Sequence, residues 1–186
     1  MSGKSLAGRK ALVTGGARGI GEAIATALAN AGASVMITDV LASLGKETAA
    51  RVASAGVKTG FHALDVTDDA QWEAAVAATV AELGGYDILI NNAGAAQTKA
   101  AIDFSEEDWT SIIDLNLNGV FRVAQAGARE MIADGREGAI INIASILGLR
   151  VAQGVASHAA SKAAVIQLSK ALALEWARYN VRVNVL

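Results

Sequence analysis

The stretch KALVTGGARGIGEAIATALANAG, residues 10–32, decides the fold that this sequence predicts. Its apolar run Ala11–Val13 indicates a short buried strand, and the alanine-rich segment that begins at Gly19 indicates a helix. The turn between them contains the glycines Gly15, Gly16, Gly19 and Gly21. A strand, a glycine turn and a helix in this order direct free backbone N–H groups and the positive end of the helix dipole toward the space before the helix. That space favours a bound anion.

The glycines of this turn have different expected roles. Gly15 allows the tight turn, Gly19 lets a pyrophosphate approach the backbone, and Gly21 lets the helix pack closely on the sheet. The spacing G-x-x-x-G-x-G differs from the more usual G-x-G-x-x-G of dinucleotide-binding turns. On this stretch alone, an ordinary glycine-rich connection between a strand and a helix stays open as an alternative.

Composition limits the class of protein. The 186 residues suit a single domain, residues 1–186, and the hydrophobic content of 53% favours a buried parallel sheet. A net charge of −2 gives no electrostatic case for binding nucleic acid or an anionic membrane. The N-terminal segment lacks the apolar core of a signal peptide, no apolar run is long enough to span a bilayer, and there is no cysteine. We therefore expect a cytoplasmic protein that binds neither nucleic acid nor membrane.

Short apolar runs alternate with longer helical patterns along the rest of the chain. Strict alternation implies parallel strands joined by right-handed crossovers, and hence a doubly wound α/β fold of three layers. Ser105 and Asp108 form a start like a capping box for the fourth helix. The expected strands are Lys10–Thr14, Ser34–Asp39, Gly60–Leu64, Asp87–Asn91, Ala139–Ser145 and Val181–Val185. The expected helices lie near Gly19–Ala31, Ala42–Ala55, Asp68–Leu83, Glu106–Ala133 and Ala156–Tyr179.

In such sheets a ligand binds beyond the carboxyl ends of the strands, where the strand order reverses. The second strand ends in Asp39, eighteen residues after Gly21. A carboxylate there can accept two hydrogen bonds from a ribose diol and repels a 2′-phosphate, so Asp39 favours NAD over NADP. Arg18 in the glycine turn could pair with a 2′-phosphate, which keeps NADP as the second candidate. The alternative for both side chains is a solvated loop charge.

The third and fourth strands also end in polar residues. Asp65 can accept a hydrogen bond from an adenine amino group, or it can cap the helix that follows. Asn91–Gly94 fits a tight turn, and it also lets the backbone lie close to a ribose while its amide side chains tie neighbouring strands. For both segments the two interpretations stay open.

Three further side chains form a candidate catalytic cluster. Ser145 ends the fifth strand and would project at the top of the sheet. His158 and Lys162 are four residues apart at the start of the next helix, so both side chains lie on one helix face. A serine at a strand end with such a helical pair on the next connection predicts a catalytic site.

Together these residues resemble the motifs of the short-chain dehydrogenase/reductase family in its NAD(P)-binding Rossmann form. The resemblance runs from about Leu6 to Leu186. The matching segments, in order, are TGGARGIG from Thr14, DV from Asp65, NNAG from Asn91, DLNLNG around Asn116, INIAS ending at Ser145 and SKAAV from Ser161. Their common order and spacing make the resemblance highly specific.

The resemblance implies reversible hydride transfer between a nicotinamide cofactor and a small-molecule secondary alcohol or ketone, with no metal site. It implies that Ser145 orients and polarises the substrate oxygen, that Lys162 holds the nicotinamide ribose, and that Asn116 binds a water of the proton relay. In the family a tyrosine is the general acid/base, and the lysine lowers its pKa because an ammonium favours the phenolate. The implied cofactor-binding residues are Gly15, Arg18, Gly19, Ile20, Gly21, Asp39, Asp65, Val66, Asn92, Gly94 and Lys162.

The sequence departs from the family pattern in two places. The position of the tyrosine, thirteen residues after Ser145, holds His158, and neither Tyr86 nor Tyr179 is placed to substitute. Family members also continue through a substrate loop, a further helix and a seventh strand, so we expect a C-terminally incomplete sheet without these elements. Two functions follow. One is an oxidoreductase impaired by His158, and the other is a dinucleotide-binding pseudoenzyme, knock-out variant or fragment without turnover.

The two longest expected helices, Glu106–Ala133 and Ala156–Tyr179, carry apolar residues on more than one face. One face must cover the sheet. The resemblance implies that the remainder joins subunits in a homodimer or homotetramer of the full-length protein. A wide apolar stripe that faces only the core is the alternative.

Overall fold

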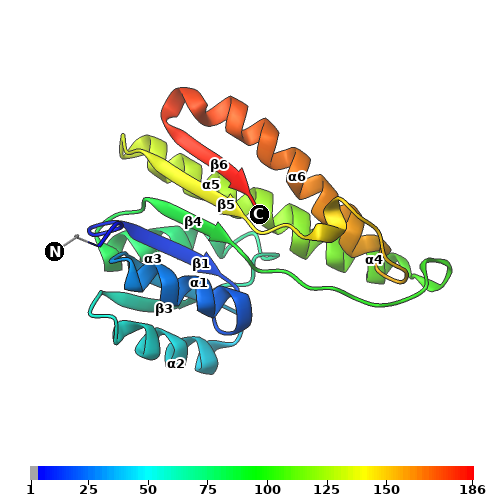
Figure 1. The fold of residues 1–186 in the computed structure, drawn as a ribbon, viewed down its shortest axis with the longest axis horizontal. Coiled ribbons are helices and arrows are strands. Elements are labelled where there is room, and N and C mark those ends of the chain that lie inside the picture. Colours follow the sequence, from blue (N-terminus) through cyan, green and yellow to red (C-terminus); the bar gives the residue numbers. More distant parts are fainter. Residues whose placement is uncertain (1–3) are drawn as a thin grey trace.

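Six parallel strands form the sheet of the computed structural model, which describes residues 4–186 (Figure 1). The strands are β1 (Lys10–Thr14), β2 (Ser34–Asp39), β3 (Thr59–Ala63), β4 (Ile88–Asn91), β5 (Gly138–Asn142) and β6 (Val181–Val185). They lie in the order β3-β2-β1-β4-β5-β6, and every neighbouring pair is parallel. The winding reverses between β1 and β4, so the predicted doubly wound fold is confirmed. Its ligand crevice belongs at the carboxyl ends of these two strands.

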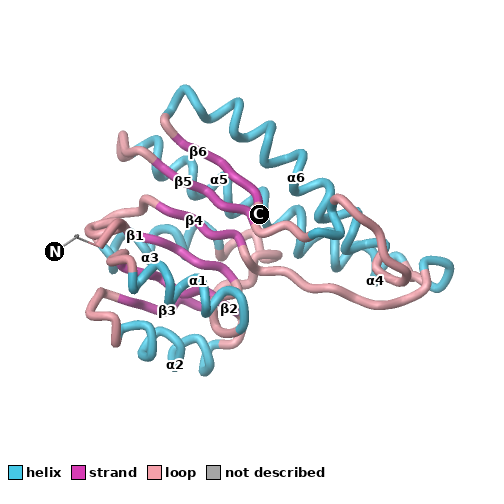
Figure 2. The backbone as a smooth tube through the Cα atoms, viewed as in Figure 1, coloured by secondary structure: helices cyan, strands magenta, loops and turns pink. Residues whose placement is uncertain are grey.

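Helices cover the sheet on both faces, which gives the three predicted layers (Figure 2). The helices are α1 (Gly19–Asn30), α2 (Ala42–Ala53), α3 (Trp72–Leu83), α4 (Glu106–Ile113), α5 (Gly119–Ala133) and α6 (Ala156–Trp176). On one face α1 packs against α2, and on the other α5 packs against α3 and α6. None of the helices within residues 4–186 is long and apolar enough to cross a membrane.

The central strand β1 contributes to the cores on both faces of the sheet. Leu12 belongs to the buried cluster beneath α3, α5 and α6, with Met131 and Ile140. Ala11 and Val13 belong to the cluster beneath α1 and α2. Because consecutive residues are buried on opposite faces, the strand is continuously apolar and does not alternate.

Several element boundaries differ from the predicted ones by one to four residues, and at two of them polar side chains close turns. β5 ends at Asn142 and not at Ser145, whose hydroxyl accepts a hydrogen bond from Leu147 N–H at the start of a short 3-10 turn. α3 begins at Trp72 and not at Asp68, since the Asp68 carboxylate accepts hydrogen bonds within the preceding turn.

The helix predicted over residues 106–133 is interrupted. Residues 114–118, between α4 and α5, form a π-helical turn. Such turns are rare inside helices and are frequent at functional sites. The capping box predicted at the start of α4 is confirmed, because Ser105 Oγ accepts from Asp108 N–H and the Asp108 carboxylate accepts from Ser105 N–H.

The α1 side of β5 is only partly covered. Ile141 and Ile143 are half-buried there. With Ile24, Leu28 and Leu186 they line an apolar cleft of about 250 Å³ beside α1. This cleft lies away from the glycine turn and contains none of the predicted site residues.

Candidate functional site

The turn between β1 and α1 adopts a backbone that only glycine accommodates well. Gly15 and Gly19 both have a φ of 60°, in the left-handed region. A Cβ added to Gly19 would meet open space, whereas a Cβ added to Gly21 would lie 2.1 Å from the Gly15 carbonyl oxygen. Gly21 therefore lets α1 approach the turn, while Gly19 keeps the outer face of the turn open.

Asn92, directly after β4, fixes this turn from the neighbouring strand. Its Nδ2 donates to the carbonyl oxygens of Thr14 at 3.0 Å and Gly15 at 2.9 Å. The buried Thr14 hydroxyl accepts from the N–H groups of Asn92 and Ala93, both at 3.0 Å. The expected tie between strands is therefore present. Sequence reasoning missed the role of Thr14, although a single polar residue that ends an apolar run was a visible signal.

The Asp39 carboxylate links the end of β2 to the glycine turn. Its Oδ2 accepts from Ala17 N–H and its Oδ1 accepts from Leu41 N–H, both at 3.0 Å. Each carboxylate oxygen keeps lone pairs for a further donor. Arg18 is exposed at the start of α1 and makes no ion pair with another residue in the part of the chain that the structure describes.

A cleft of about 460 Å³ opens over the carboxyl ends of β1, β2 and β4, at the switch point of the sheet. Its volume is that of a small-molecule site. The first N–H groups of α1 have no side-chain cap and can therefore bind an anion. The cleft is lined by the predicted residues Gly15, Arg18, Gly19, Ile20, Asp39, Asp65, Val66, Asn92 and Gly94, and also by Val40, Leu41, Leu64, Ala93 and Leu115.

Two predicted cofactor residues, Gly21 and Lys162, lie outside the lining of this cleft. Gly21 is buried beneath the turn, and Lys162 lies on α6. A larger cavity of about 580 Å³ runs beside β6 and the end of α6, but it contains none of the predicted site residues. The predicted residues therefore select the smaller cleft as the candidate site.

Asp65 closes a short turn and does not cap α3. Its Oδ1 accepts from the Thr67 N–H at 2.9 Å and from the Thr67 hydroxyl at 2.7 Å. The N-cap residue of α3 is Gln71, further along the chain. The helix-cap interpretation of Asp65 is therefore wrong, and its half-buried carboxylate lines the cleft.

Asn116 is fully buried in the π-helical turn and binds the loop that follows β4. Its Oδ1 accepts from Ala95 N–H at 2.9 Å. Its Nδ2 donates to the Ala95 carbonyl oxygen at 2.8 Å and to Ser161 Oγ at 3.1 Å. The side chain thus holds the loop against α6. Sequence reasoning missed Ser161 as a partner.

His158 and Lys162 lie one turn apart at the start of α6, as predicted. His158 Nδ1 is 3.0 Å from the Ala95 carbonyl oxygen. Lys162 is buried, and its Nζ donates to the Ile143 carbonyl oxygen at 2.7 Å. Burial lowers the pKa of the Lys162 ammonium below its ordinary value, because the charged form loses hydration.

The cleft and the catalytic candidates meet at Gly94. A Cβ added to Gly94 would lie 3.0 Å from Asn116 Oδ1 and 3.5 Å from Lys162 Nζ. Ser145 begins the 3-10 turn Ile146–Gly148, and a Cβ on Gly148 would lie 2.9 Å from the Lys162 carbonyl oxygen. The chain at Gly94 and the 3-10 turn Ile146–Gly148 therefore both pack closely against the Lys162 region of α6.

A buried polar network supports this end of the sheet, and sequence reasoning predicted its tie between strands but not its extension to α6. Asn91 Nδ2 donates to Asn142 Oδ1 at 2.9 Å, and Asn142 Nδ2 donates to Ser169 Oγ at 2.9 Å. The two asparagines occupy the same register position of β4 and β5. Each asparagine follows an apolar run in the sequence, and this repeated pattern could have predicted the link between the sheet and α6.

A doubly wound parallel sheet with a glycine turn and a cleft at its switch point defines a dinucleotide-binding protein of the Rossmann class. The family model described as short chain dehydrogenase matches residues 9–186. The chain belongs to this family, so the resemblance predicted from its motifs is confirmed.

Curated relatives of the chain are dehydrogenases and reductases. The 3-oxoacyl-acyl-carrier-protein reductase FabG of Chlamydia muridarum is 42% identical over 180 residues, which cover 96% of this chain and 72% of that protein. The 2-dehydro-3-deoxy-D-gluconate 5-dehydrogenase of Dickeya dadantii is 39% identical over 180 residues, which cover 97% of this chain and 70% of that protein. The chain is therefore an oxidoreductase of this family.

Solved structures agree with this assignment. A short-chain type dehydrogenase/reductase from Mycobacterium marinum has a TM-score of 0.94 and 38% identity, with 98% of this chain and 73% of that chain covered. Carveol dehydrogenase from Mycobacterium avium, solved in complex with NAD, has a TM-score of 0.93 and 29% identity, with 97% of this chain and 70% of that chain covered.

Proposed function

We propose that this oxidoreductase interconverts a secondary alcohol and a ketone by hydride transfer, with NAD as the preferred cofactor and NADP as the second candidate. We further propose that His158 takes the place of the family's catalytic tyrosine. One observation carries the proposal: the cleft at the switch point ends at Gly94, where Asn116 and Lys162 approach the backbone.

The cleft fits a dinucleotide on three counts. Gly19 leaves open space above the turn, the first N–H groups of α1 have no side-chain cap, and Asp39 lines the cleft beside them. When bound, the nicotinamide supplies the hydride acceptor or donor that side chains lack. Gly15, Gly19 and Ile20 would hold the pyrophosphate, and Gly21 would let α1 pack beneath them. Asp39 would hold the adenosine ribose, Asp65 and Val66 the adenine, and Asn92, Gly94 and Lys162 the nicotinamide side. Arg18 would meet a 2′-phosphate.

The catalytic side chains have separate roles in this proposal. Ser145 orients the substrate oxygen, His158 exchanges a proton with it, and Lys162 places a positive charge beside them. Asn116 positions the loop after β4, and the relay water remains a prediction for this residue. An imidazole is shorter than a phenol by roughly an ångström or two, and such a misplacement can cost about a hundredfold in rate. Turnover is therefore slower than with tyrosine.

We also propose that the full-length protein is a cytoplasmic homodimer or homotetramer that pairs through α4, α5 and α6. Trp109, Phe121 and Leu174 on these helices are exposed, while their core-facing residues are buried. Exposed aromatic and aliphatic side chains on neighbouring helices are typical of subunit contacts. Light scattering at micromolar concentration that shows only monomer would contradict this assembly.

The second candidate function is a dinucleotide-binding module without turnover. The observation that favours it is the identity of His158, since the residues that would bind the cofactor do not depend on it. Binding and turnover must therefore be measured separately.

The test uses the 186-residue chain with NAD and a panel of secondary alcohols, and with NADH and the matching ketones. The panel includes sugar acids and 3-oxoacyl thioesters, which the relatives' names suggest. NADP and NADPH run in parallel, and Ser145→Ala is the control. Turnover that Ser145→Ala abolishes supports the oxidoreductase. Saturable cofactor binding without turnover supports the module, and no binding overturns both.

A further inference from the structure

The hydrogen bonds around Ala95 determine which nitrogen of the His158 ring carries a proton. Asn116 Nδ2 has two hydrogens, and both are used: one on the Ala95 carbonyl oxygen and one on Ser161 Oγ. The Ser161 hydroxyl in turn donates to the His158 carbonyl oxygen at 2.8 Å, so Ser161 Oγ accepts from Asn116. The 3.4 Å approach of Asn116 Nδ2 to His158 Nδ1 therefore has no hydrogen to share.

The remaining partner of His158 Nδ1 is the Ala95 carbonyl oxygen at 3.0 Å, and a carbonyl oxygen can only accept. Nδ1 consequently carries a hydrogen and donates it. In the neutral ring the lone pair then lies on Nε2, which is the nitrogen left for proton transfer. A neutral imidazole in this state is a base at Nε2, which suits removal of a proton from an alcohol.

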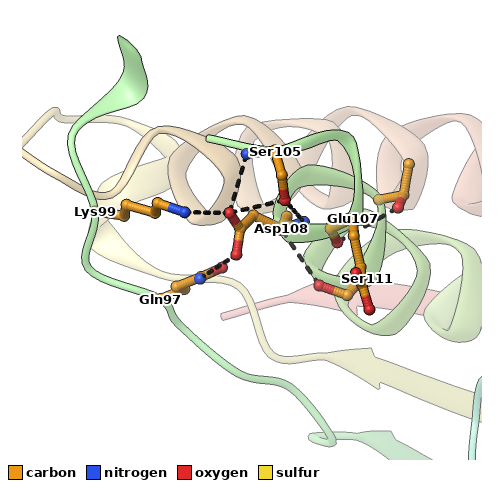
Figure 3. A network of polar contacts seen from close by, with 7 residues as sticks. Gln97, Lys99, Ser105, Glu107, Asp108 and Ser111 are labelled. Atoms are coloured by element: carbon orange, nitrogen blue, oxygen red, sulfur yellow. Dashed lines mark hydrogen bonds and ion pairs between the residues drawn. The ribbon is translucent and has the colours of Figure 1, made fainter. Parts of the chain in front are cut away.

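The Ala95 carbonyl belongs to the segment 95–99, which is held by side chains at both of its ends. At one end Asn116 binds the N–H and the carbonyl of Ala95. At the other end the Asp108 carboxylate accepts from Gln97 Nε2 at 2.6 Å and from Lys99 Nζ at 2.5 Å (Figure 3). Lys99 N–H also donates to the Gly154 carbonyl oxygen at 2.9 Å, just before α6.

The Asp108 carboxylate, the anchor of this segment, binds side chains of the loop and also groups of its own helix cap. Besides Gln97 and Lys99, its carboxylate accepts from the N–H and the hydroxyl of Ser105, within the capping box of α4. Several hydrogen bonds hold the pKa of this carboxyl well below its ordinary value, and the one from Lys99 has the largest effect. The anchor is therefore charged throughout the neutral range.

We propose that Asp108 is a positioning residue for the His158 imidazole. By tying Gln97 and Lys99 to the start of α4, it keeps the Ala95 carbonyl against Nδ1 and holds the ring in the Nδ1–H tautomer. The role of Nε2 as a base rests on the proposed function, but the tautomer itself does not.

The test reads the tautomer directly by long-range 1H–15N correlation spectra of the chain without cofactor or substrate. The spectra are recorded at about pH 8, where a free imidazole is neutral. Protonated and unprotonated ring nitrogens have well-separated 15N shifts. The chain has two histidines, so His62→Gln assigns the signals of His158. We expect a protonated Nδ1 and an unprotonated Nε2.

Four variants separate the anchor from the helix cap. Asp108→Ala and the double variant Gln97→Leu/Lys99→Met release the segment, and the double variant leaves the capping box intact. Ser105→Ala removes the capping hydroxyl but keeps the bonds to Gln97 and Lys99. Glu107→Ala removes another acidic residue from the first turn of α4, an exposed one. If Asp108→Ala does not fold, the double variant answers the same question.

We expect both releasing variants to show a second His158 species with Nε2 protonated, while Ser105→Ala and Glu107→Ala keep the original spectrum. Where turnover is measurable, the releasing variants should lower kcat for alcohol oxidation about tenfold, because a small misplacement of the base is costly. An unprotonated Nδ1 in the unmodified chain, or an unchanged tautomer in both releasing variants, overturns the inference. The expected spectra together with no turnover by the unmodified chain would overturn the proposed function alone.

Discussion

The two halves of the site are built in different ways. Over β1 and β2, the cleft is formed by backbone: Gly15 and Gly19 have left-handed conformations, and Asn92 and Asp39 bind main-chain groups of the turn. Over β4, β5 and α6, the site is formed by side chains that project from different elements and bind one another or a loop.

This difference indicates which substitutions each half of the site tolerates. A site formed by backbone is altered mainly by adding atoms where the chain approaches itself or a ligand. A site formed by side chains is altered by exchanging one residue, and the fold remains. The proposed replacement of the family's tyrosine by His158 is such an exchange, because the His158 ring contacts the Ala95 carbonyl oxygen from the start of α6.

The largest expected effect comes from adding a methyl group to the backbone-built half. Gly21→Ala should lower the free energy of unfolding by about 3 kcal/mol, since the new Cβ would meet the Gly15 carbonyl and the structure must shift. Gly19→Ala should cost only about 1 kcal/mol for its left-handed backbone. It should nevertheless weaken NADH binding, because its Cβ enters the open space above the turn.

Thermal unfolding followed by circular dichroism, together with nicotinamide fluorescence, separates these two glycines. Equal losses of stability in the two variants would show that the turn is not packed as described. Unchanged NADH affinity in Gly19→Ala would place the pyrophosphate elsewhere.

A smaller effect is expected in the half built by side chains. His158→Tyr should raise the rate of ketone reduction about tenfold, since a phenol reaches further toward the substrate and Lys162 favours its ionised form. Alcohol oxidation should rise less, because the His158 ring already presents a base. Initial rates in both directions at several pH values measure this. If the tyrosine variant is no faster in either direction, His158 is an adapted catalytic residue and the enzyme is not impaired.

A small change in stability is expected at Lys162, whose ammonium is buried without a carboxylate partner among residues 4–186. Lys162→Met should raise the free energy of unfolding at neutral pH by about 1 kcal/mol while abolishing turnover, the usual trade between stability and function. Because burial lowers the folded pKa, the unfolded chain binds more protons between that pKa and 10.5. The unmodified protein should therefore gain stability as pH rises through this window.

Urea unfolding of the unmodified protein and of Lys162→Met, from pH 7 to about pH 10, checks the direction in which stability changes with pH. The difference in free energy of unfolding that favours Lys162→Met over the unmodified protein should become smaller as pH rises. An advantage that grows with pH, or a variant less stable than the unmodified chain at pH 7, would contradict the assigned cost of burial.

The backbone-built half was also the more predictable from sequence. The alternation of apolar runs and helical patterns predicted the sheet, and the glycines predicted the cleft at its switch point. The π-helical turn at residues 114–118 was missed, because a helical pattern does not reveal one extra residue in a turn. The network through Asp108, Gln97 and Lys99 was missed as well, since its members depend on how a loop returns to a helix cap.

The central claim is that the cleft lined by Asp39 holds a nicotinamide dinucleotide and discriminates between its two forms. Titration of the unmodified chain with NADH and NADPH, followed by nicotinamide fluorescence, tests it most directly. We predict saturable binding, with a higher affinity for NADH than for NADPH. The difference between the two affinities should be smaller in Asp39→Ala, where the carboxylate no longer repels a 2′-phosphate. Tighter binding of NADPH than of NADH by the unmodified chain, or no saturable binding of either, would contradict it.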